Sequence, residues 1–248
     1  LADLERRGLV AVDDGPPATV VTTVPALADV VRDDAGPLQR RMVLEGVVEA
    51  AGDGYDGGLD PVRLAAWTLE LGRTPGPELV ARAAPLALGR FDLATAEALA
   101  DRMPPTTVAS VVLGRAAALQ GRFEEGLAHL RRAREQARDD RERVEATAAL
   151  LEATAFVGGD RAAANQLLAD TLRTTDDPDL RRELEIRSGL LPALDGRFDA
   201  ALALAPALDE GRLPPAVEAQ GRVVLALARA MTGRVEGMLE GLAPADSL

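Results

Sequence analysis

Gly121-Arg122-Phe123 is a short phrase that the chain repeats as Gly89-Arg90-Phe91, as Gly196-Arg197-Phe198 and, with valine in place of the aromatic, as Gly233-Arg234-Val235. A fifth, weaker copy is Gly159-Asp160-Arg161. Each copy follows an Ala- and Leu-rich stretch of helical length and precedes another such stretch. Because glycine commonly ends a helix, each copy is predicted to be the tight turn inside a helix-turn-helix pair.

The glycines of the five copies follow one another at spacings of 32, 38, 37 and 37 residues. Such regular spacing is typical of helical pairs that stack one on the next. The chain is therefore expected to be a solenoid of helical repeats and not a compact enzyme with a single core.

The chain from residue 61 onward is predicted to be helical to its end, because Gly, Pro or Asp separates stretches of similar length. The predicted helices cover about 61–72, 77–88, 91–102, 105–120, 123–138, 142–157, 161–173, 178–195, 198–210, 215–232 and 235–242. Short connections make neighbouring helices antiparallel, so residues 61–248 are assigned to a helical-repeat superhelix.

Residues 1–52 are predicted to form a small module of another kind. The chain begins with what resembles the last turns of a helix ending at Gly8, and alternation between Val10 and Val24 then indicates two strands around a turn. A helix followed by a hairpin is the pattern of a winged-helix module. Two further helices, each opened by a proline, are expected at about 25–32 and 37–51.

The Gly- and Asp-rich residues 53–60 are predicted to be a linker between the two parts. Their aspartates also suggest a calcium loop, in which Asp53, Tyr55 and Gly57 would take the first three ligand positions. Only one of these side chains coordinates calcium well, so the linker is the favoured interpretation.

Composition restricts the function classes. The chain is 47% hydrophobic but only 2% aromatic, so its core must be built mainly from Ala, Leu and Val, which let helices pack closely. Its formal net charge is −12, and all of its basic residues are arginines. Phosphate contacts need a basic face, so binding to nucleic acid or to an anionic membrane is not expected.

The chain has no cysteine, which excludes disulfides and agrees with the expected cytoplasmic location. No apolar run approaches the ~18 residues of a membrane span, and no signal peptide is recognised. Because the chain starts at Leu1 in what resembles the middle of a helix, we expect it to be part of a longer protein. Arginine in place of lysine, with abundant Ala, Gly and Pro, is typical of a GC-rich bacterial genome.

The predicted pairs resemble tetratricopeptide repeats, in which a glycine and then an aromatic mark the turn and a small residue follows three positions later. The matching sets are Gly121, Phe123 and Gly126; Gly89, Phe91 and Ala94; Gly196, Phe198 and Ala201; and Gly159, Arg161 and Ala164. Leu113-Gly114 and Gly189 match the family's glycine in the first helix of a pair. Pro85 and Pro192 depart from the pattern and are expected to bend the helices that contain them.

The order of the parts is similar to that of the large ATP-binding LuxR-type transcriptional regulators of actinobacteria, relatives of the maltose-regulon activator in the STAND class. The resemblance rests on the winged-helix-like start, the linker, Pro61-Val-Arg-Leu-Ala-Ala-Trp67 and Phe91-Asp92-Leu-Ala94. The family places a nucleotide-binding module before these parts and a helix-turn-helix after them. The resemblance implies that this chain covers the middle of such a protein. Val24-Pro25 departs from the His-Pro of many relatives.

No catalytic, metal or cofactor site is predicted. A phosphate loop needs a lysine, so ATP is expected only in an upstream domain. His129 is the only histidine, and without cysteines it is interpreted as a half-exposed helical residue. The basic run 131–143 contains interleaved acids, which favour a solvated helix end over a nucleic-acid patch. Trp67 is interpreted as a core residue.

The inner surface of the predicted superhelix is the candidate groove for a ligand or partner. The repeat register places on it Val108, Val111, Arg115, Leu119, Phe156, Val223 and Leu227. This face is nearly all apolar. It is therefore either buried against itself in a tight superhelix or available to an apolar ligand or a partner helix.

Two functional hypotheses follow. The first is a non-enzymatic sensor and signal-relay region of an ATP-dependent LuxR-type regulator, which binds an inducer or a protein partner. The second is a tetratricopeptide adaptor that holds a protein segment and has no role in DNA binding. A phosphate loop upstream and a helix-turn-helix downstream would favour the first hypothesis.

Overall fold

The computed structural model describes residues 2–13, 19–24, 26, 30, 34–51, 59–209 and 213–234. The chain forms two compact units, Leu1–Gly89 (unit 1) and Arg90–Leu248 (unit 2). The predicted helix at 235–242 lies outside the described residues, as do most of the predicted helix at 25–32 and most of the predicted linker. The division after Gly89 groups the first two helices that follow this linker with unit 1.

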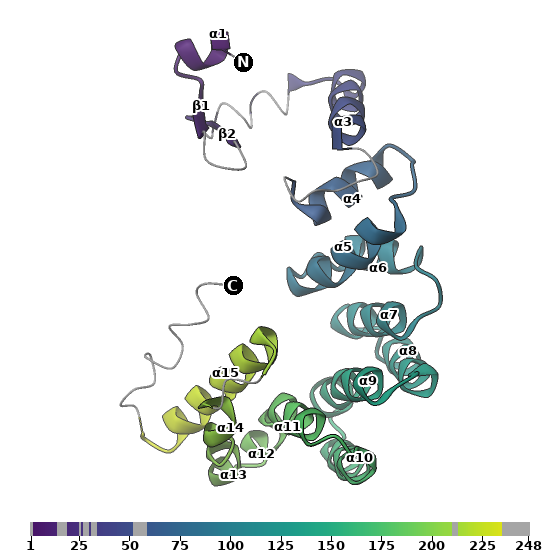
Figure 1. Ribbon diagram of the computed structural model, residues 1–248, viewed down its shortest axis with the longest axis vertical. Helices are drawn as coiled ribbons and strands as arrows, with labels where there is room; N and C mark the ends of the chain where they lie inside the picture. The colour runs from purple at the N-terminus through teal and green to yellow at the C-terminus, as the bar shows by residue number, and fades with distance from the viewer. Residues whose placement is uncertain are drawn as a thin grey trace. The chain divides into compact units, whose positions relative to one another are not determined.

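Unit 1 begins with the predicted helix and hairpin (Figure 1). Helix α1 (Ala2–Arg6) ends at Gly8, whose φ of 68° is the left-handed conformation that glycine adopts without cost. Strands β1 (Val10–Asp13) and β2 (Thr19–Thr22) pair antiparallel, and within the described part of the chain they are the only strands. The remaining described helices of unit 1 are α3 (Pro37–Ala51), α4 (Pro61–Glu70) and α5 (Pro77–Gly89).

Unit 2 is built from helical pairs, which confirms a mainly α, helical-repeat fold. Its helices are α6 (Leu93–Ala100), α7 (Thr107–Leu119), α8 (Phe123–Gln136), α9 (Asp140–Glu152), α10 (Arg161–Thr174), α11 (Pro178–Arg187), α12 (Leu190–Leu194), α13 (Phe198–Leu202), α14 (Ala205–Asp209) and α15 (Pro215–Met231). In Figure 1, α8 and α10 lie on one side of the row formed by α7, α9 and α11. We call α7, α9, α11 and α15 the first helices, because each contacts the next.

The turn glycines behave as predicted in four of the five copies. Gly121, Gly159, Gly196 and Gly233 have φ values of 82°, 68°, 74° and 73°. A side chain is disfavoured at such angles, which explains why glycine occupies these turns.

The copy at Gly89-Arg90-Phe91 differs, and the predicted register there is wrong by two residues. Gly89 is still part of α5, and Phe91 takes the left-handed angle, with φ of 59°. The shift arises because the Asp92 side chain accepts a hydrogen bond from the Thr95 backbone N–H at 3.2 Å and so caps α6. The small residue buried after this turn is therefore Ala96 and not Ala94, which is exposed.

The small residues after the other turns are buried, and Gly126 lies at a tight helix crossing. A Cβ added to Gly126 would lie 2.7 Å from the Gly114 carbonyl oxygen, so α7 and α8 approach with almost no side chain between them. Ala164 and Ala201 are fully buried at the same repeat position. The predicted close crossing is confirmed for Gly126, and the burial of Ala164 and Ala201 agrees with the same role.

Prolines break two of the predicted helices into pieces. A proline has no N–H and clashes with the carbonyl group four residues earlier. Pro192 clashes with the carbonyl group of Ser188, which lies between the end of α11 and the start of α12. Pro206 clashes with the carbonyl group of Leu202, the last residue of α13, and α14 starts at Ala205. Pro85, by contrast, lies within an uninterrupted α5.

Arginines of the turn phrases connect neighbouring pairs. Arg122 forms an ion pair with Glu97 of α6, and it lowers the pKa of that carboxyl group through the hydrogen bond. Arg161 pairs with Asp195 of the next turn at 3.2 Å. These contacts give the turns a second role, because each helps to fix the position of one pair against another.

Candidate partner-binding face

Most residues predicted for the inner face carry exposed apolar side chains. Five of them are well exposed: Val108 (37%), Leu119 (51%), Phe156 (41%), Val223 (56%) and Leu227 (40%). A surface on which several exposed apolar side chains gather is a candidate site for a protein or ligand contact. The alternative that this face is buried against itself does not hold for these residues.

Val111 is an exception, because it is buried and belongs to the core. It packs in one cluster with Leu130 of α8 and with alanines of α7 and α9. The predicted groove included Val111 because it assigned too wide a stripe of each first helix to the inner surface. The exposed stripe on each first helix is narrower than predicted, because part of the predicted stripe faces the second helix of the same pair.

The residues of the narrower stripe are identified by how many positions they precede the turn glycine in the sequence. On α7 it contains Arg115 and Leu119, six and two residues before Gly121. On α15 the same two positions hold Leu227 and Met231, and Met231 is also exposed. We define the inner face as Val108, Arg115, Leu119, Glu152, Phe156, Gln220, Leu227 and Met231. Val223 takes on α15 the position that Val111 takes on α7, so it is left out of this definition although it is exposed.

A π-helix shifts this stripe by one residue on α9. Residues Ala153–Val157 form a widened turn in which the Gly158 N–H donates to the Ala153 carbonyl oxygen at 2.9 Å. The inserted residue places Glu152 and Phe156 at the inner-face positions, whereas Ala153 is buried. The spacing of 38 residues between Gly121 and Gly159, against 37 for the later copies, was the sequence feature that could have revealed the insertion.

A chain of polar contacts crosses the inner face and connects the four first helices α7, α9, α11 and α15. Glu152 forms an ion pair with Arg115 of α7 through one carboxylate oxygen. Its other oxygen accepts a hydrogen bond from the Gln220 amide of α15 at 3.3 Å, and the same amide donates to the Arg187 carbonyl oxygen at 3.2 Å. These side chains are partly exposed, so the chain lies among the apolar residues where a partner can reach it. Sequence reasoning missed Glu152 because its contacts span 37 and 68 residues.

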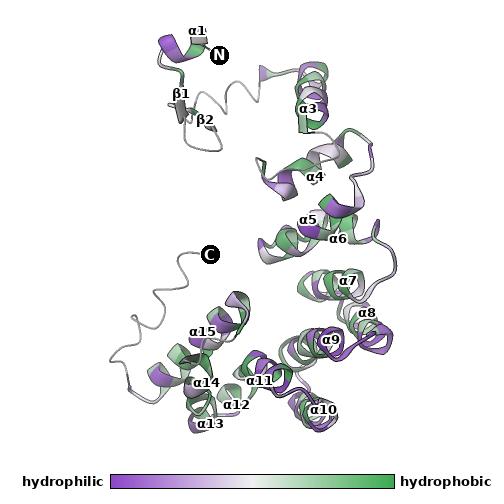
Figure 2. Ribbon diagram, in the orientation of Figure 1, coloured by the Kyte–Doolittle hydropathy of each residue, from purple (hydrophilic) through white to green (hydrophobic). Residues whose placement is uncertain are grey.

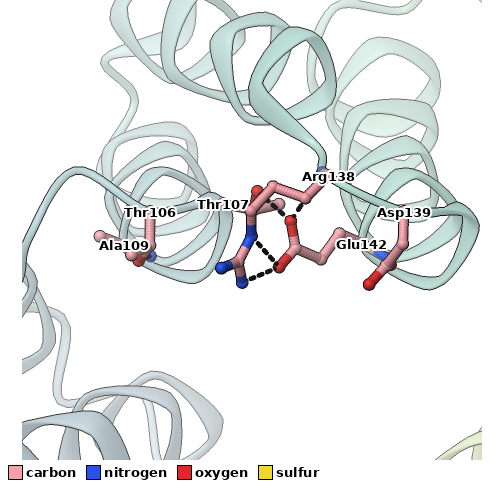
Figure 3. A network of polar contacts seen from close by, with 6 residues as sticks. All are labelled: Thr106, Thr107, Ala109, Arg138, Asp139 and Glu142. Carbon is pink, nitrogen blue, oxygen red and sulfur yellow. Dashed lines mark hydrogen bonds and ion pairs between the residues drawn. The ribbon is translucent and has the colours of Figure 1, made fainter.

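A second polar network holds the beginning of α7 against the beginning of α9 (Figure 3). The Glu142 carboxylate accepts hydrogen bonds from the Thr107 hydroxyl at 3.0 Å and from the Arg138 backbone N–H at 2.9 Å, and it pairs with the Arg138 guanidinium. The Arg138 contacts are the main reason why the pKa of Glu142 falls to about 2. Thr106 and Asp139 cap the two helices. The network therefore fixes α7 against α9, two of the helices that carry the inner face.

The two helices of the α7–α8 pair differ in hydropathy. Figure 2 shows mostly hydrophobic residues on α7 and mostly hydrophilic residues on the neighbouring α8. In the basic run 131–143, Arg138, Arg141 and Arg143 form ion pairs with Glu142, Glu183 and Asp140. His129 is half-buried on α8 and Trp67 is half-buried on α4.

A cavity of about 180 Å³ lies beside α11. It is lined by Arg141, Asp179, Arg182, Glu183, Leu213 and Pro214. The buried Glu183 carboxylate pairs with Arg187 at 2.8 Å and with Arg141 at 3.5 Å. Its lining is thus chiefly a set of internal ion pairs, unlike the apolar inner face.

Among the described residues, no cluster of three or more His, Asp or Glu side chains is arranged to hold a metal ion. A search of the same residues finds no helix with the length and apolar character needed to cross a membrane.

Comparisons with known proteins give few matches. No protein-family model matches the chain, and no curated protein matches it. A solved structure, "MamA AMB-1 C2221", is similar with a TM-score of 0.36 and 20% sequence identity, over 69% of this chain and 98% of the solved chain. A TM-score this low supports no functional conclusion.

Proposed function

We propose that the inner face of unit 2 binds an amphipathic helical segment of a protein partner, without catalysis. The observation that carries this proposal is the set of exposed apolar side chains on α7, on the π-helix that follows α9 and on α15, with Leu119, Phe156 and Leu227 as its main members. An amphipathic helix docks by laying apolar side chains into such a surface at intervals of three or four residues.

The polar chain among these apolar residues adds a requirement on the partner. Arg115 and Glu152 would lose water when a segment covers them, and buried charges are costly unless they keep hydrogen bonds. The partner is therefore expected to carry at least one polar side chain on its otherwise apolar face. This requirement supplies specificity that an apolar surface alone does not have.

A protein segment suits the face better than a small-molecule inducer does. Sites for small molecules are usually enclosed pockets of about 300–1,000 Å³ lined mainly by apolar groups. The cavity beside α11 is smaller, at about 180 Å³, and its lining is charged. The exposed apolar residues of the inner face come from several helices, as in a surface that an extended segment covers.

At a finer level, we propose that the chain is the sensor and signal-relay region of an ATP-dependent LuxR-type regulator in the cytoplasm. The helix and hairpin of unit 1, followed by helical pairs, support this proposal because they agree with the order that the sequence resemblance implies. The coding sequence on either side tests it. A phosphate loop upstream and a helix-turn-helix downstream are expected, and their absence would leave the adaptor hypothesis.

A peptide selection tests the binding proposal. A phage-displayed library of randomised helical peptides is selected against the full chain, and the enriched peptides are measured by fluorescence anisotropy. Leu227→Asp places a charge on the inner face and is expected to weaken these peptides by about tenfold or more.

Phe123→Asp is the matched control, because Phe123 on α8 is 45% exposed, close to the 40% of Leu227. Circular dichroism checks that both variants keep the helical fold. Equal loss of affinity in the two variants, or loss only with Phe123→Asp, would place the binding surface elsewhere.

A further inference from the structure

We infer that the helical segment bound by the inner face presents a neutral carboxamide, from Gln or Asn, to the polar chain of Arg115, Glu152 and Gln220. This inference rests on the proposed function, because it names the polar side chain that the partner carries. Covering the three residues removes their water, so each hydrogen-bonding atom that lacks a partner within the protein must find one in the segment.

The Glu152 carboxylate is paired on both of its oxygens. One oxygen accepts from the Arg115 guanidinium, and the other accepts from the Gln220 amide nitrogen at 3.3 Å. Arg115 and Glu152 carry opposite charges, so the pair has no net charge. A partner side chain therefore need not bring a charge of its own to this part of the inner face.

Gln220 donates through both of its N–H groups and has its oxygen left as an acceptor. The amide nitrogen donates to Glu152 and to the Arg187 carbonyl oxygen at 3.2 Å. A reversed amide would place its oxygen against these two acceptors, so the orientation is fixed. Gln220 Oε1 accepts no hydrogen bond from any residue that the structure describes.

Arg115 has several donors left. A guanidinium carries five N–H groups, and within the described ranges those of Arg115 engage only Glu152. The side chain is partly exposed, so water reaches the remaining donors in the uncovered protein. A docked segment displaces this water and must supply an acceptor in its place.

A carboxamide supplies both missing groups, since its oxygen accepts from Arg115 and its NH2 group donates to Gln220 Oε1. A carboxylate would add a second negative charge beside Glu152 and would leave the Gln220 oxygen without a donor. A lysine or arginine would donate to Gln220, but Arg115 would repel it. An aliphatic side chain would leave both groups unpaired. The neutral amide is therefore the side chain that fits.

A second set of the same three residue types provides a matched control. Glu97 pairs with Arg122 through one oxygen, and its other oxygen accepts from the Gln120 amide at 3.0 Å. The Arg122 and Glu97 side chains are 38% and 25% exposed, close to the 36% and 28% of Arg115 and Glu152. Glu97 belongs to α6, and the other two residues lie between α7 and α8, so this set is outside the inner face.

Peptide sequences give the first test. Library peptides that bind the full chain and are weakened by Leu227→Asp are sequenced, and Gln or Asn is expected to be enriched at one position of their apolar face. Replacing this amide by Leu or by Glu should weaken binding about tenfold in fluorescence anisotropy. Equal or tighter binding of either replacement would overturn the inference.

Two double variants of the chain locate the effect. In Arg115→Leu/Glu152→Leu, which removes both charges together, the Leu peptide should bind at least as tightly as the amide peptide. In the control Arg122→Leu/Glu97→Leu, the tenfold preference for the amide should remain. Circular dichroism checks that both variants keep the helical fold. A preference that persists in both variants, or disappears in both, would contradict the assignment to Arg115 and Glu152.

Leu227→Asp separates failure of this inference from failure of the proposed function. Peptides that Leu227→Asp weakens, but that bind equally well with Leu in place of the amide, would overturn the inference and leave the proposed function in place. Peptides that bind Leu227→Asp as tightly as the unmodified chain do not lie on the inner face, so both would be overturned.

Discussion

Gly114 and Gly126 meet backbone to backbone where α7 crosses α8. A Cβ on Gly114 would lie 2.9 Å from the Gly126 carbonyl oxygen, and a Cβ on Gly126 would lie 2.7 Å from the Gly114 oxygen. Neither distance leaves room for a side chain. The contact sets how closely the helices of this pair approach, and the same repeat position in later pairs holds the buried Ala164 and Ala201.

Ala164→Leu should destabilise unit 2, because Ala164 is fully buried at such a crossing. Overpacking of this kind costs about 1–3 kcal/mol in the free energy of unfolding. Ala162→Leu, on the same helix but exposed, should be nearly neutral. Urea denaturation followed by circular dichroism measures both variants. Equal midpoints and slopes would show that the repeat register is wrong.

Gly121→Ala should also destabilise unit 2, but through the backbone. Gly121 has φ of 82°, and nothing lies within 4 Å of an added Cβ, so the cost is conformational and about 1 kcal/mol. Gly121→Asn should cost less, because asparagine tolerates the left-handed region better than alanine does. The same unfolding measurement compares the two variants. If Gly121→Asn lowers the free energy of unfolding by at least as much as Gly121→Ala does, the left-handed backbone angle is not the source of the cost.

Glu142→Gln should make stability less sensitive to acid. The pKa of Glu142 in the folded protein is lowered to about 2, from an ordinary value of 4.5. A lowered pKa means that the carboxylate stabilises the fold above about pH 4.5, and that this contribution is lost as the pH falls towards 2.

The urea midpoints of Glu142→Gln and the unmodified chain should therefore differ most above pH 5 and converge towards pH 2. Glu145→Gln, at an exposed position on the same helix, serves as the control. A midpoint difference that stays constant over this range would contradict the assigned role of Glu142.

A double-mutant cycle on Arg115 and Glu152 should show a small favourable coupling. The pair connects α7 to α9, and its side chains are 36% and 28% exposed, so solvent screening limits the coupling to about 0.2–1 kcal/mol. Arg115→Gln, Glu152→Gln and the double variant are compared by urea denaturation at low salt. Additive effects of the two substitutions would show that the contact is not formed in solution.

Much of the fold could be predicted from the sequence because its determinants are local. Turn glycines, proline starts and apolar periodicity gave the helix order and the hairpin. The predictions missed features that depend on competition between local contacts, and features that depend on contacts between residues far apart in the sequence. Asp92 moved the start of α6 by capping it, and Pro206 divided a predicted helix.

The candidate site was predictable only in outline. The repeat register placed Leu119, Phe156 and Leu227 on one surface, and the structure exposes all three. It also assigned Val111 to that surface, although α8 covers this residue. Glu152 was not predicted, because the π-helix shifts α9 by one residue and its contacts come from helices distant in sequence.

Hydrogen exchange of the chain with a selected helical peptide tests the central claim most directly, because it maps where the peptide lies. If the inner face binds the peptide, backbone amides of α7, α9 and α15 should exchange more slowly in the complex, while those of α8 and α10 should be unchanged. Slower exchange confined to α8 and α10 would contradict the claim that the first helices carry the partner-binding face.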